Sequence, residues 1–164
     1  MKRIAIAALM LFAFALPASG QTKYGATVTP DKATDFAKIK TYVWQPGWDA
    51  NDKKAHALIV AAVDRELKAL GLEKKTAGPS DVIVKYASLR RIDVDLTAKP
   101  APDQARRQID VGSLIVLMLD PASGKELLRA RVDKQIELDP AQAEATVNSA
   151  VAELFAQYPT RVKK

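Results

Sequence analysis

The stretch Val111–Val132, VGSLIVLMLDPASGKELLRARV, has the pattern of a β-hairpin. Its segment Leu114–Leu119 is an unbroken apolar run whose length and β-branched content indicate a buried strand. The turn residues Asp120–Gly124 follow, and beyond them Leu128 and Ala130 alternate with arginines. One side of this second strand is therefore expected to be buried and the other solvated. We expect the first strand of the hairpin to lie near the middle of a sheet.

The chain begins with the three parts of a secretory signal, over Met1–Gly20. Lys2 and Arg3 form the positive region, Ile4–Leu16 forms the apolar region, and Ala18–Gly20 supplies the small residues that signal peptidase requires. The apolar run is too short for a bilayer-spanning helix, which needs about 20 apolar residues. We expect cleavage after the last residue of this segment, no transmembrane anchor in the mature chain, and a periplasmic or secreted location.

The remaining residues 21–164 have the length of a single domain. The chain contains no cysteine, which excludes disulfides, a thiol nucleophile and the lipid attachment of a bacterial lipoprotein. The net charge of +6 falls to +4 when the two positive charges of the signal are removed. Basic residues occur in pairs, Arg90 with Arg91 and Arg106 with Arg107, rather than in the long runs that bind nucleic acid. We therefore expect a solvated basic surface, or attraction to an anionic envelope component, and no nucleic-acid partner.

Hydrophobic periodicity predicts two helices. Lys53–Leu70 has one apolar stripe, candidate N-cap residues among positions 49–52, and Gly71 where a C-terminal glycine belongs. Ala141–Tyr158 has a second apolar stripe and follows Asp139, a favourable N-cap residue.

The extended segments predict a sheet. They are Thr27–Pro30, Thr41–Trp44, Asp81–Leu89 with a continuation over Arg91–Leu96, and the two hairpin strands, while Thr97–Gln108 is expected to be a solvent loop. The order of elements predicts an α+β fold, a two-layer sandwich of a mostly antiparallel β-sheet with two amphipathic helices packed on one face.

No catalytic constellation is recognisable in the sequence. His56 is the single histidine and has no identifiable carboxylate or nucleophile partner, so we expect it at the surface or at the border of the core. Asp93 and Asp95 are too few oxygen ligands for a calcium or magnesium site. Ser113 lacks the pattern of a nucleophile elbow, and we assign Asp64 to the solvated side of the first helix. We expect no catalytic residue, no metal site and no cofactor, and therefore not an enzyme.

Four stretches together carry a resemblance to a known family. They are Thr29–Trp44, Val63–Leu72 followed by Ser80–Tyr86, Gly112–Val132, and Ala150–Pro159. In order and spacing they resemble the bacterial envelope proteins of domain-of-unknown-function family 4136. Many members are lipoproteins with a cysteine at the cleavage point, so the absence of that residue here implies a protein free in the periplasm. The family has no assigned activity, so the resemblance implies a fold and a location and no mechanism.

We therefore expect a non-catalytic accessory protein that binds an envelope protein or an anionic envelope component. The candidate binding residues are Tyr42, Trp44, Trp48, Arg90, Arg91, Arg106 and Arg107. Trp48 follows a strand in a predicted loop, where we expect a lid on the core, with a binding surface as the alternative. The alternative function is a carrier of a small apolar or amphiphilic ligand held between the sheet and the helices.

Overall fold

The structure is a computed structural model and describes residues 25–94, 105–136 and 139–161. Its elements in chain order are β1 (Ala26–Pro30), the 3-10 helix η1 (Phe36–Lys38), β2 (Thr41–Trp44), α1 (Lys53–Ala69), β3 (Glu73–Lys74), β4 (Val82–Val94), β5 (Gln108–Leu119), β6 (Glu126–Gln135) and α2 (Pro140–Phe155). The predicted signal segment, residues 1–20, lies outside the described residues.

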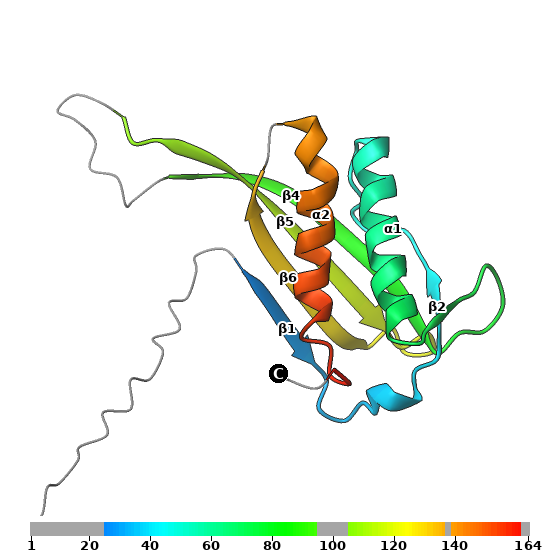
Figure 1. Ribbon diagram of the computed structural model, residues 1–164. Helices are drawn as coiled ribbons and strands as arrows, with labels where there is room; N and C mark the ends of the chain where they lie inside the picture. Colours follow the sequence, from blue (N-terminus) through cyan, green and yellow to red (C-terminus); the bar gives the residue numbers. More distant parts are fainter. Residues whose placement is uncertain (1–24, 95–104, 137–138, 162–164) are drawn as a thin grey trace, which may run out of the picture.

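The strands form one open, mixed sheet with the order β1-β6-β5-β4-β2-β3. The neighbours β1, β6, β5 and β4 pair in antiparallel fashion, whereas β2 runs parallel to both β4 and β3. Both helices lie on the same face of this sheet (Figure 1). The predicted α+β sandwich, with two helices on one face of a mostly antiparallel sheet, is therefore confirmed.

The hairpin of β5 and β6 has the predicted turn and position. The Asp120 carboxylate accepts hydrogen bonds from the backbone of Ala122 and Ser123, and Gly124 adopts a φ of 70° that suits glycine. Because β4 and β6 both pair with β5, the apolar run predicted as a central strand is central.

Helix α1 begins at Lys53, as the sequence predicts, and ends at Ala69, one residue earlier than predicted. Asp52 is the N-cap residue, and its carboxylate accepts a 2.7 Å hydrogen bond from the backbone N–H of Ala55. Gly71 follows the helix with a φ of 85°, the left-handed conformation that commonly ends helices. The buried side consists of Ile59, Ala62, Val63 and Leu67.

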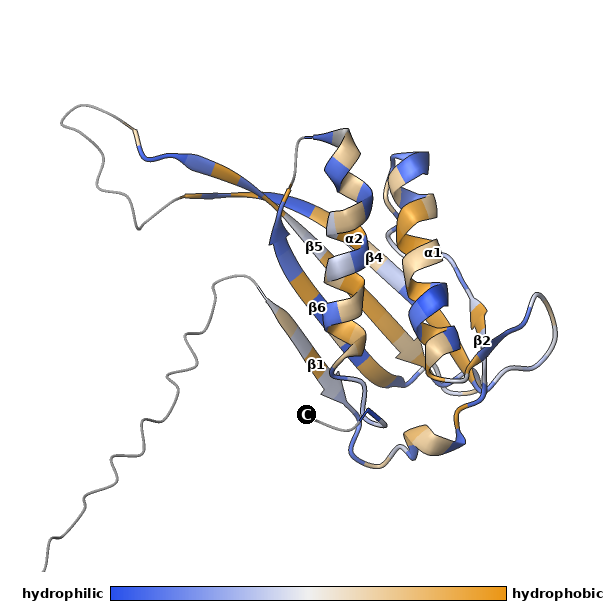
Figure 2. Ribbon diagram, viewed as in Figure 1, coloured by the Kyte–Doolittle hydropathy of each residue, from blue (hydrophilic) through white to orange (hydrophobic). Residues whose placement is uncertain are grey.

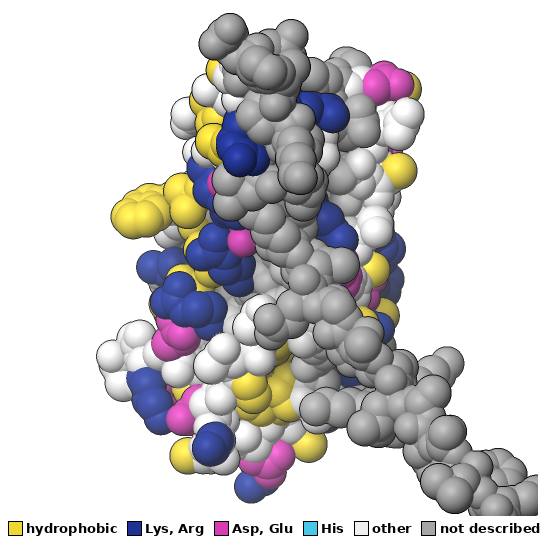
Figure 3. Space-filling model, turned by 90° about the vertical axis from the view of Figure 1, so that its left-hand side faces the viewer, with side chains coloured by type: hydrophobic (Ala, Val, Ile, Leu, Met, Phe, Trp, Pro, Cys, Tyr) yellow, Lys and Arg dark blue, Asp and Glu magenta, His cyan; other side chains and the backbone are white. Residues whose placement is uncertain are grey.

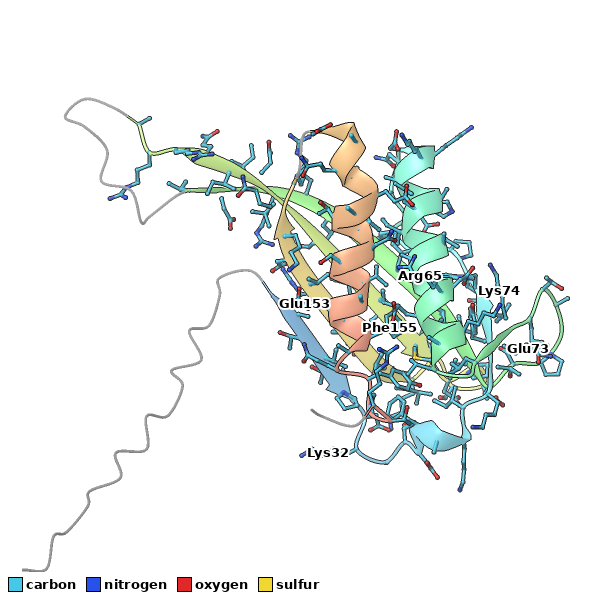
Figure 4. The ribbon with its side chains drawn as sticks, in the orientation of Figure 1. Lys32, Arg65, Glu73, Lys74, Glu153 and Phe155 are labelled. Atoms are coloured by element: carbon cyan, nitrogen blue, oxygen red, sulfur yellow. The ribbon has the colours of Figure 1, made fainter. Side chains whose placement is uncertain are left out.

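Helix α2 packs beside α1. Asp139 caps its N-terminus through a 2.9 Å hydrogen bond from Ala141 N–H, as predicted. The helix ends at Phe155, three residues earlier than predicted. Both terminal nitrogens of Arg65 on α1 donate to Asn148 Oδ1 on α2, each at 3.2 Å, which links the exposed sides of the helices (Figure 4).

The core lies between the helices and the sheet. Alternate strand residues face the helices, which gives β6 alternating colours in Figure 2, whereas the unbroken apolar run of β5 is hydrophobic throughout. The fully buried strand residues on this side are Val82, Val84, Tyr86, Val116, Met118, Leu128, Ala130 and Val132, and they meet Ala150, Val151, Leu154 and Phe155 of α2.

Strands β4 and β5 continue past the helices as a projecting two-stranded arm (Figure 1). Pairing extends to Val94 opposite Gln108, so the predicted loop ends earlier than expected and Gln108 belongs to β5. The continuation of β4 is confirmed as far as Val94, and its predicted last residues lie outside the described residues. On the arm the side chain of Ile92 is 62% exposed.

Candidate functional site

The strand register assigns a second set of side chains to the face of the sheet that carries no helix in the described part of the chain. One row across this helix-free face contains Trp48, Ala87, Ile115, Arg131 and Thr27. The neighbouring row contains Lys85, Leu117, Arg129 and Thr29. Apolar residues of β4 and β5 therefore occupy the middle of the face, with basic residues on both sides of them.

Trp48 is attached to this face by its backbone. Its N–H donates to Tyr86 O at 3.1 Å, and its carbonyl accepts from Ser88 N–H at 2.9 Å, so it pairs with β4 like a short parallel strand. Gly47 permits this approach, because a Cβ at that position would lie 2.1 Å from Tyr86 O. The Trp48 side chain is 75% exposed, so the expectation that it covers the core is wrong. It stands on the surface instead.

A shallow depression of about 480 Å³ lies beside Trp48 on the helix-free face. Its apolar lining includes Ala87, Ile115 and Leu117, and its basic lining consists of Lys85 and Arg129. Arg129 is paired with Glu126, to which it donates two hydrogen bonds. The half-buried Lys85 has no ion-pair or hydrogen-bond partner among the described residues.

A second charged group lies further along the same face, towards the arm. Arg91 donates to Ser113 Oγ at 2.8 Å and lies 3.4 Å from an oxygen of Asp133, which also accepts from Arg131. Burial alone would raise the pKa of Asp133. Hydrogen bonds from Ser113, Arg131 and Arg91 outweigh burial, and the pKa lies below the ordinary value of an aspartate. Asp93 pairs with Arg91 at 3.0 Å. The acids and bases of this group balance each other.

Figure 3 shows hydrophobic side chains next to Lys and Arg side chains on the side turned away from the helices, at the left of the view. Asp and Glu side chains are interspersed among them. Apolar side chains and charges of both signs therefore occur together on this side of the molecule.

The structure does not bring the predicted aromatic residues together. Tyr42 and Trp44 face α1, on the opposite side of the sheet from Trp48, and Tyr42 is buried. Tyr42 Oη and Trp44 Nε1 both donate to Asp64 Oδ1 at 2.7 Å, and Lys74 Nζ approaches Asp64 Oδ2 at 2.8 Å. Burial, with the hydrogen bond to Asp64, raises the pKa of Tyr42. The assignment of Asp64 to the solvated side of its helix is therefore wrong, since this carboxylate joins β2 to α1.

The predicted arginines also separate. Arg91 belongs to the helix-free face, whereas Arg90 points to the other side of β4 and pairs with Asp110 at 3.0 Å. Arg106 and Arg107 are exposed where the described chain resumes before β5. Of the seven predicted binding residues, only Trp48 and Arg91 lie on the helix-free face of the folded sheet.

His56 lies at the border of the core, as expected. Its Nδ1 is 2.7 Å from Tyr86 Oη, which also accepts a 2.9 Å hydrogen bond from Ala50 N–H. The hydroxyl therefore contacts both the backbone of Ala50 and the ring of His56. Both ring and hydroxyl are therefore engaged in a structural contact, and Tyr86 is 1% exposed.

A separate cavity of about 190 Å³, partly open to solvent, lies between the helices and the sheet. Its wall is mostly apolar and includes Ile59 of α1, Leu114 and Val132 of the sheet, and Ala143 and Val147 of α2. This is the position at which a carried ligand was expected. Sequence patterns do not reveal such a cavity, because its size depends on how the helices sit on the sheet.

The described residues contain neither a metal-binding cluster nor a membrane-spanning helix. No three or more His, Asp or Glu side chains gather there in a way that suits a metal ion. No helix among them is long and apolar enough to cross a membrane.

Comparison with known families decides the relationship of the chain. The family model described as "Domain of unknown function (DUF4136)" matches residues 27–160. The chain belongs to the DUF4136 family. The four stretches that carry the resemblance in the sequence thus identify the family correctly. A comparison with curated proteins gave no match.

Solved structures share the DUF4136 fold. A PDZ domain protein from Parabacteroides distasonis is similar with a TM-score of 0.57 and 19% identity, over 85% of this chain and 36% of that chain. The PelC dodecamer from Paraburkholderia phytofirmans is similar with a TM-score of 0.56 and 11% identity, over 86% of this chain and 99% of that chain. The DUF4136 chain thus spans 36% of the first protein and nearly all of the PelC chain. At these identities the similarity shows the fold alone.

Proposed function

We propose that this DUF4136 protein is an exported, non-catalytic accessory protein of the bacterial cell envelope, which binds another envelope component through the helix-free face. One observation carries the proposal. Trp48 is 75% exposed beside the half-buried apolar residues Ile115 and Leu117, on a sheet face that no described helix covers. Contiguous exposed apolar surface with polar margins is characteristic of interaction sites.

The edges of the sheet are protected, which leaves the face as the available surface. At the β1 edge, Glu153 accepts from Ala26 N–H at 3.0 Å, and Gln157 donates to Ala26 O at 3.1 Å. Pro30 at the other end of β1 has no N–H to offer a further strand. The opposite edge, β3, contains only Glu73 and Lys74. Addition of a partner strand is therefore disfavoured at both edges.

The non-catalytic part of the proposal is supported by how the titratable groups are used. Asp64, Asp133 and His56 each have partners within the protein that account for their positions. A catalytic base needs a reachable nucleophile or substrate proton, and the hydroxyl beside His56 belongs to the buried Tyr86. Export is supported by the N-terminal pattern and by membership of DUF4136.

The first experiment is mass spectrometry of the protein purified from the periplasm of its own cell. The mass of the denatured protein is expected to match a chain that begins at Gln21. A mass that matches a chain still containing Met1–Gly20 would disprove the cleavage. Crosslinking in the intact envelope is then compared for the wild type and Trp48→Ala. We expect the variant to lose its crosslinked adducts while keeping its stability, because the indole is exposed. Unchanged adducts would show that the helix-free face is not the binding surface.

A carrier of a small apolar ligand is the second candidate, and the helix-side cavity favours it. A dry apolar cavity of about 150 Å³ holds a molecule of the size of benzene. The cavity of about 190 Å³ between the helices and the sheet is therefore large enough for one ring or for the end of an acyl chain. Whole drug-sized ligands occupy about 300–1,000 Å³. A carried molecule would thus be held by one apolar end.

Native mass spectrometry tests this second candidate. An excess native mass that disappears on denaturation is expected for a carrier. Ala143→Leu fills part of the cavity and should abolish that excess mass, whereas Lys54→Gln, on the exposed side of α1, should preserve it. A bare monomer from the native envelope would reject the carrier and leave the proposal for the helix-free face unaffected.

A further inference from the structure

The backbone of Trp48 is bound to β4, and its side chain projects from the surface. Two backbone hydrogen bonds to β4 fix its position, and the absence of a side chain at Gly47 allows the chain to run this close to Tyr86 O. An indole of this size can bury roughly 150–250 Å² of surface, yet only a quarter of the Trp48 side chain is covered. The fold gains little from this side chain, so its contact area is available to something outside the protein.

The neighbouring charge is positive and uncompensated. Lys85 lies on the same face, one row away from Trp48, and has no acidic partner among the described residues. Arg129, two strands away and so roughly 10 Å across the sheet, is already paired with Glu126. Lys85 is half-buried beside Leu117, and its ammonium would be stabilised by an anionic group that approaches from outside.

We propose that the helix-free face docks on an anionic lipid surface, with the Trp48 indole at the level of the headgroups and Lys85 in contact with a phosphate. Trp is favoured at the boundary between water and lipid because its ring is apolar and its N–H is polar. Basic side chains beside it are attracted by anionic headgroups at short range. The envelope location comes from the proposed function, so this inference extends it by naming the partner.

The shape of the site selects a lipid surface over a dissolved anion. Trp48 is 75% exposed although it lines this depression, so a small molecule seated in it would leave most of the projecting indole in water. A membrane surface covers the indole, Lys85, Arg129 and Arg131 together. Because the acids and bases around Arg91 balance, Lys85 supplies the net charge of the contact.

Vesicle binding by the purified protein tests the inference. We compare vesicles of phosphatidylcholine with vesicles that also contain phosphatidylglycerol, and measure cosedimentation and tryptophan emission. Binding is expected only with the anionic lipid, with a blue shift of the emission and a decline as salt screens the charges. Trp48→Ala retains Trp44 as the emission background, so it should lose the blue shift and bind about tenfold more weakly.

The charge contribution has a matched control. Lys85→Gln should weaken binding about fivefold, as expected for one basic residue at an anionic surface. Lys54→Gln removes the same charge from an exposed position on the helix side and should leave binding unchanged. If both variants lost the same amount of vesicle affinity, the net charge of the protein, and not the position of Lys85, would explain binding, and the inference would be overturned.

Two other results would also overturn it. Equal affinity for phosphatidylcholine alone, or for a monomeric short-chain phosphatidylglycerol, would exclude recognition of an anionic lipid surface. No vesicle binding, with envelope crosslinks that depend on Trp48, would assign the face to a protein partner. Because the assay uses purified protein, its failure does not depend on whether the cell exports the chain.

Discussion

The side chains of Trp44 and Asp64 join the second strand of the sheet to the first helix. Trp44 Nε1 donates a 2.7 Å hydrogen bond to Asp64 Oδ1, and Tyr42 Oη donates to the same oxygen at 2.7 Å. Lys74, on the adjacent edge strand β3, neutralises the other carboxylate oxygen. One carboxylate thus satisfies two aromatic donors at the boundary of the core, and hydrogen bonds to a charged acceptor are stronger than those between neutral groups.

Replacement of Asp64 by alanine should destabilise the protein by about 2–4 kcal/mol, because two donors at the core boundary lose their acceptor. Asp64→Asn keeps an acceptor oxygen for Tyr42 and Trp44. It loses the charge and the acceptor of the exposed Lys74, so we expect a smaller loss of about 1 kcal/mol. Urea unfolding followed by circular dichroism gives both values.

A double-mutant cycle provides the control for this prediction. Tyr42→Phe removes one donor, so the effect of Asp64→Ala should be smaller in the Tyr42→Phe background than in the wild type. Additive effects of the two substitutions would show that the hydrogen bond between them contributes nothing to stability.

The sequence predicts what depends on local chemistry. The hairpin turn at Asp120, the helix caps at Asp52 and Asp139 and the helix stripes follow from side chains near in sequence, and all of them are present. The role of Asp64 was missed because it depends on a strand more than 20 residues away. Asp64 does lie three residues before the buried Leu67, which places it at the border of the apolar stripe.

The candidate site was less predictable than the fold, for the same reason. Trp48 lies on the helix-free face only because the backbone after β2 continues along β4 and pairs with Ala87. A shift of one residue in that pairing would turn its side chain to the other face. Lys85 gave no sequence signal, since its lack of an acidic partner depends on the register of three strands.

Gly47→Ala should cost about 1–3 kcal/mol of stability, because the new Cβ would overlap the carbonyl oxygen of Tyr86 and the backbone would have to shift. The shift should also change the emission of Trp48. Urea unfolding and fluorescence measure the two effects. Gly112→Ala is the control, since its Cβ would lie 3.4 Å from the Ile136 side chain and 3.9 Å from Lys134 O, which are ordinary contact distances. Equal stability losses would mean that close backbone approach is not the cause.

Asp81 should contribute to the acid sensitivity of the protein. Its carboxylate accepts hydrogen bonds from the backbone N–H groups of Lys40 and Thr41, both at 2.8 Å, and these bonds hold the pKa of Asp81 below its ordinary value. Because the pKa of Asp81 is lower in the folded protein than in the unfolded chain, its ionisation stabilises the fold. This stabilisation is complete above the unfolded-state pKa of about 3.9 and is lost as the pH falls through the folded-state pKa.

Asp81→Asn should therefore be less stable than the wild type at neutral pH, and the difference should narrow below about pH 4. Urea unfolding of both proteins from neutral pH to about pH 2 measures the difference. A difference that stays constant over this range would show that ionisation of Asp81 does not stabilise the fold.

Tyr158→Phe should leave the protein as stable as the wild type or more stable by up to about 1 kcal/mol. The ring of Tyr158 packs edge-on against Phe36 at 5.5 Å, while its buried hydroxyl has no hydrogen-bond partner among the described residues. The variant keeps the ring contact and removes the unpaired group. Burial raises the pKa of Tyr158 to about 12.

The pH dependence of the same pair of proteins gives a second readout. Because the pKa of Tyr158 is higher in the folded protein than in the unfolded chain, the fold favours the neutral phenol. The resulting stabilisation is complete below the unfolded-state pKa of about 10 and is lost as the pH rises towards 12. The stability advantage of Tyr158→Phe should therefore grow above about pH 10, as measured by urea unfolding in alkaline buffer. If the variant were instead less stable at neutral pH by more than about 1 kcal/mol, the hydroxyl would have a partner in solution that stabilises it.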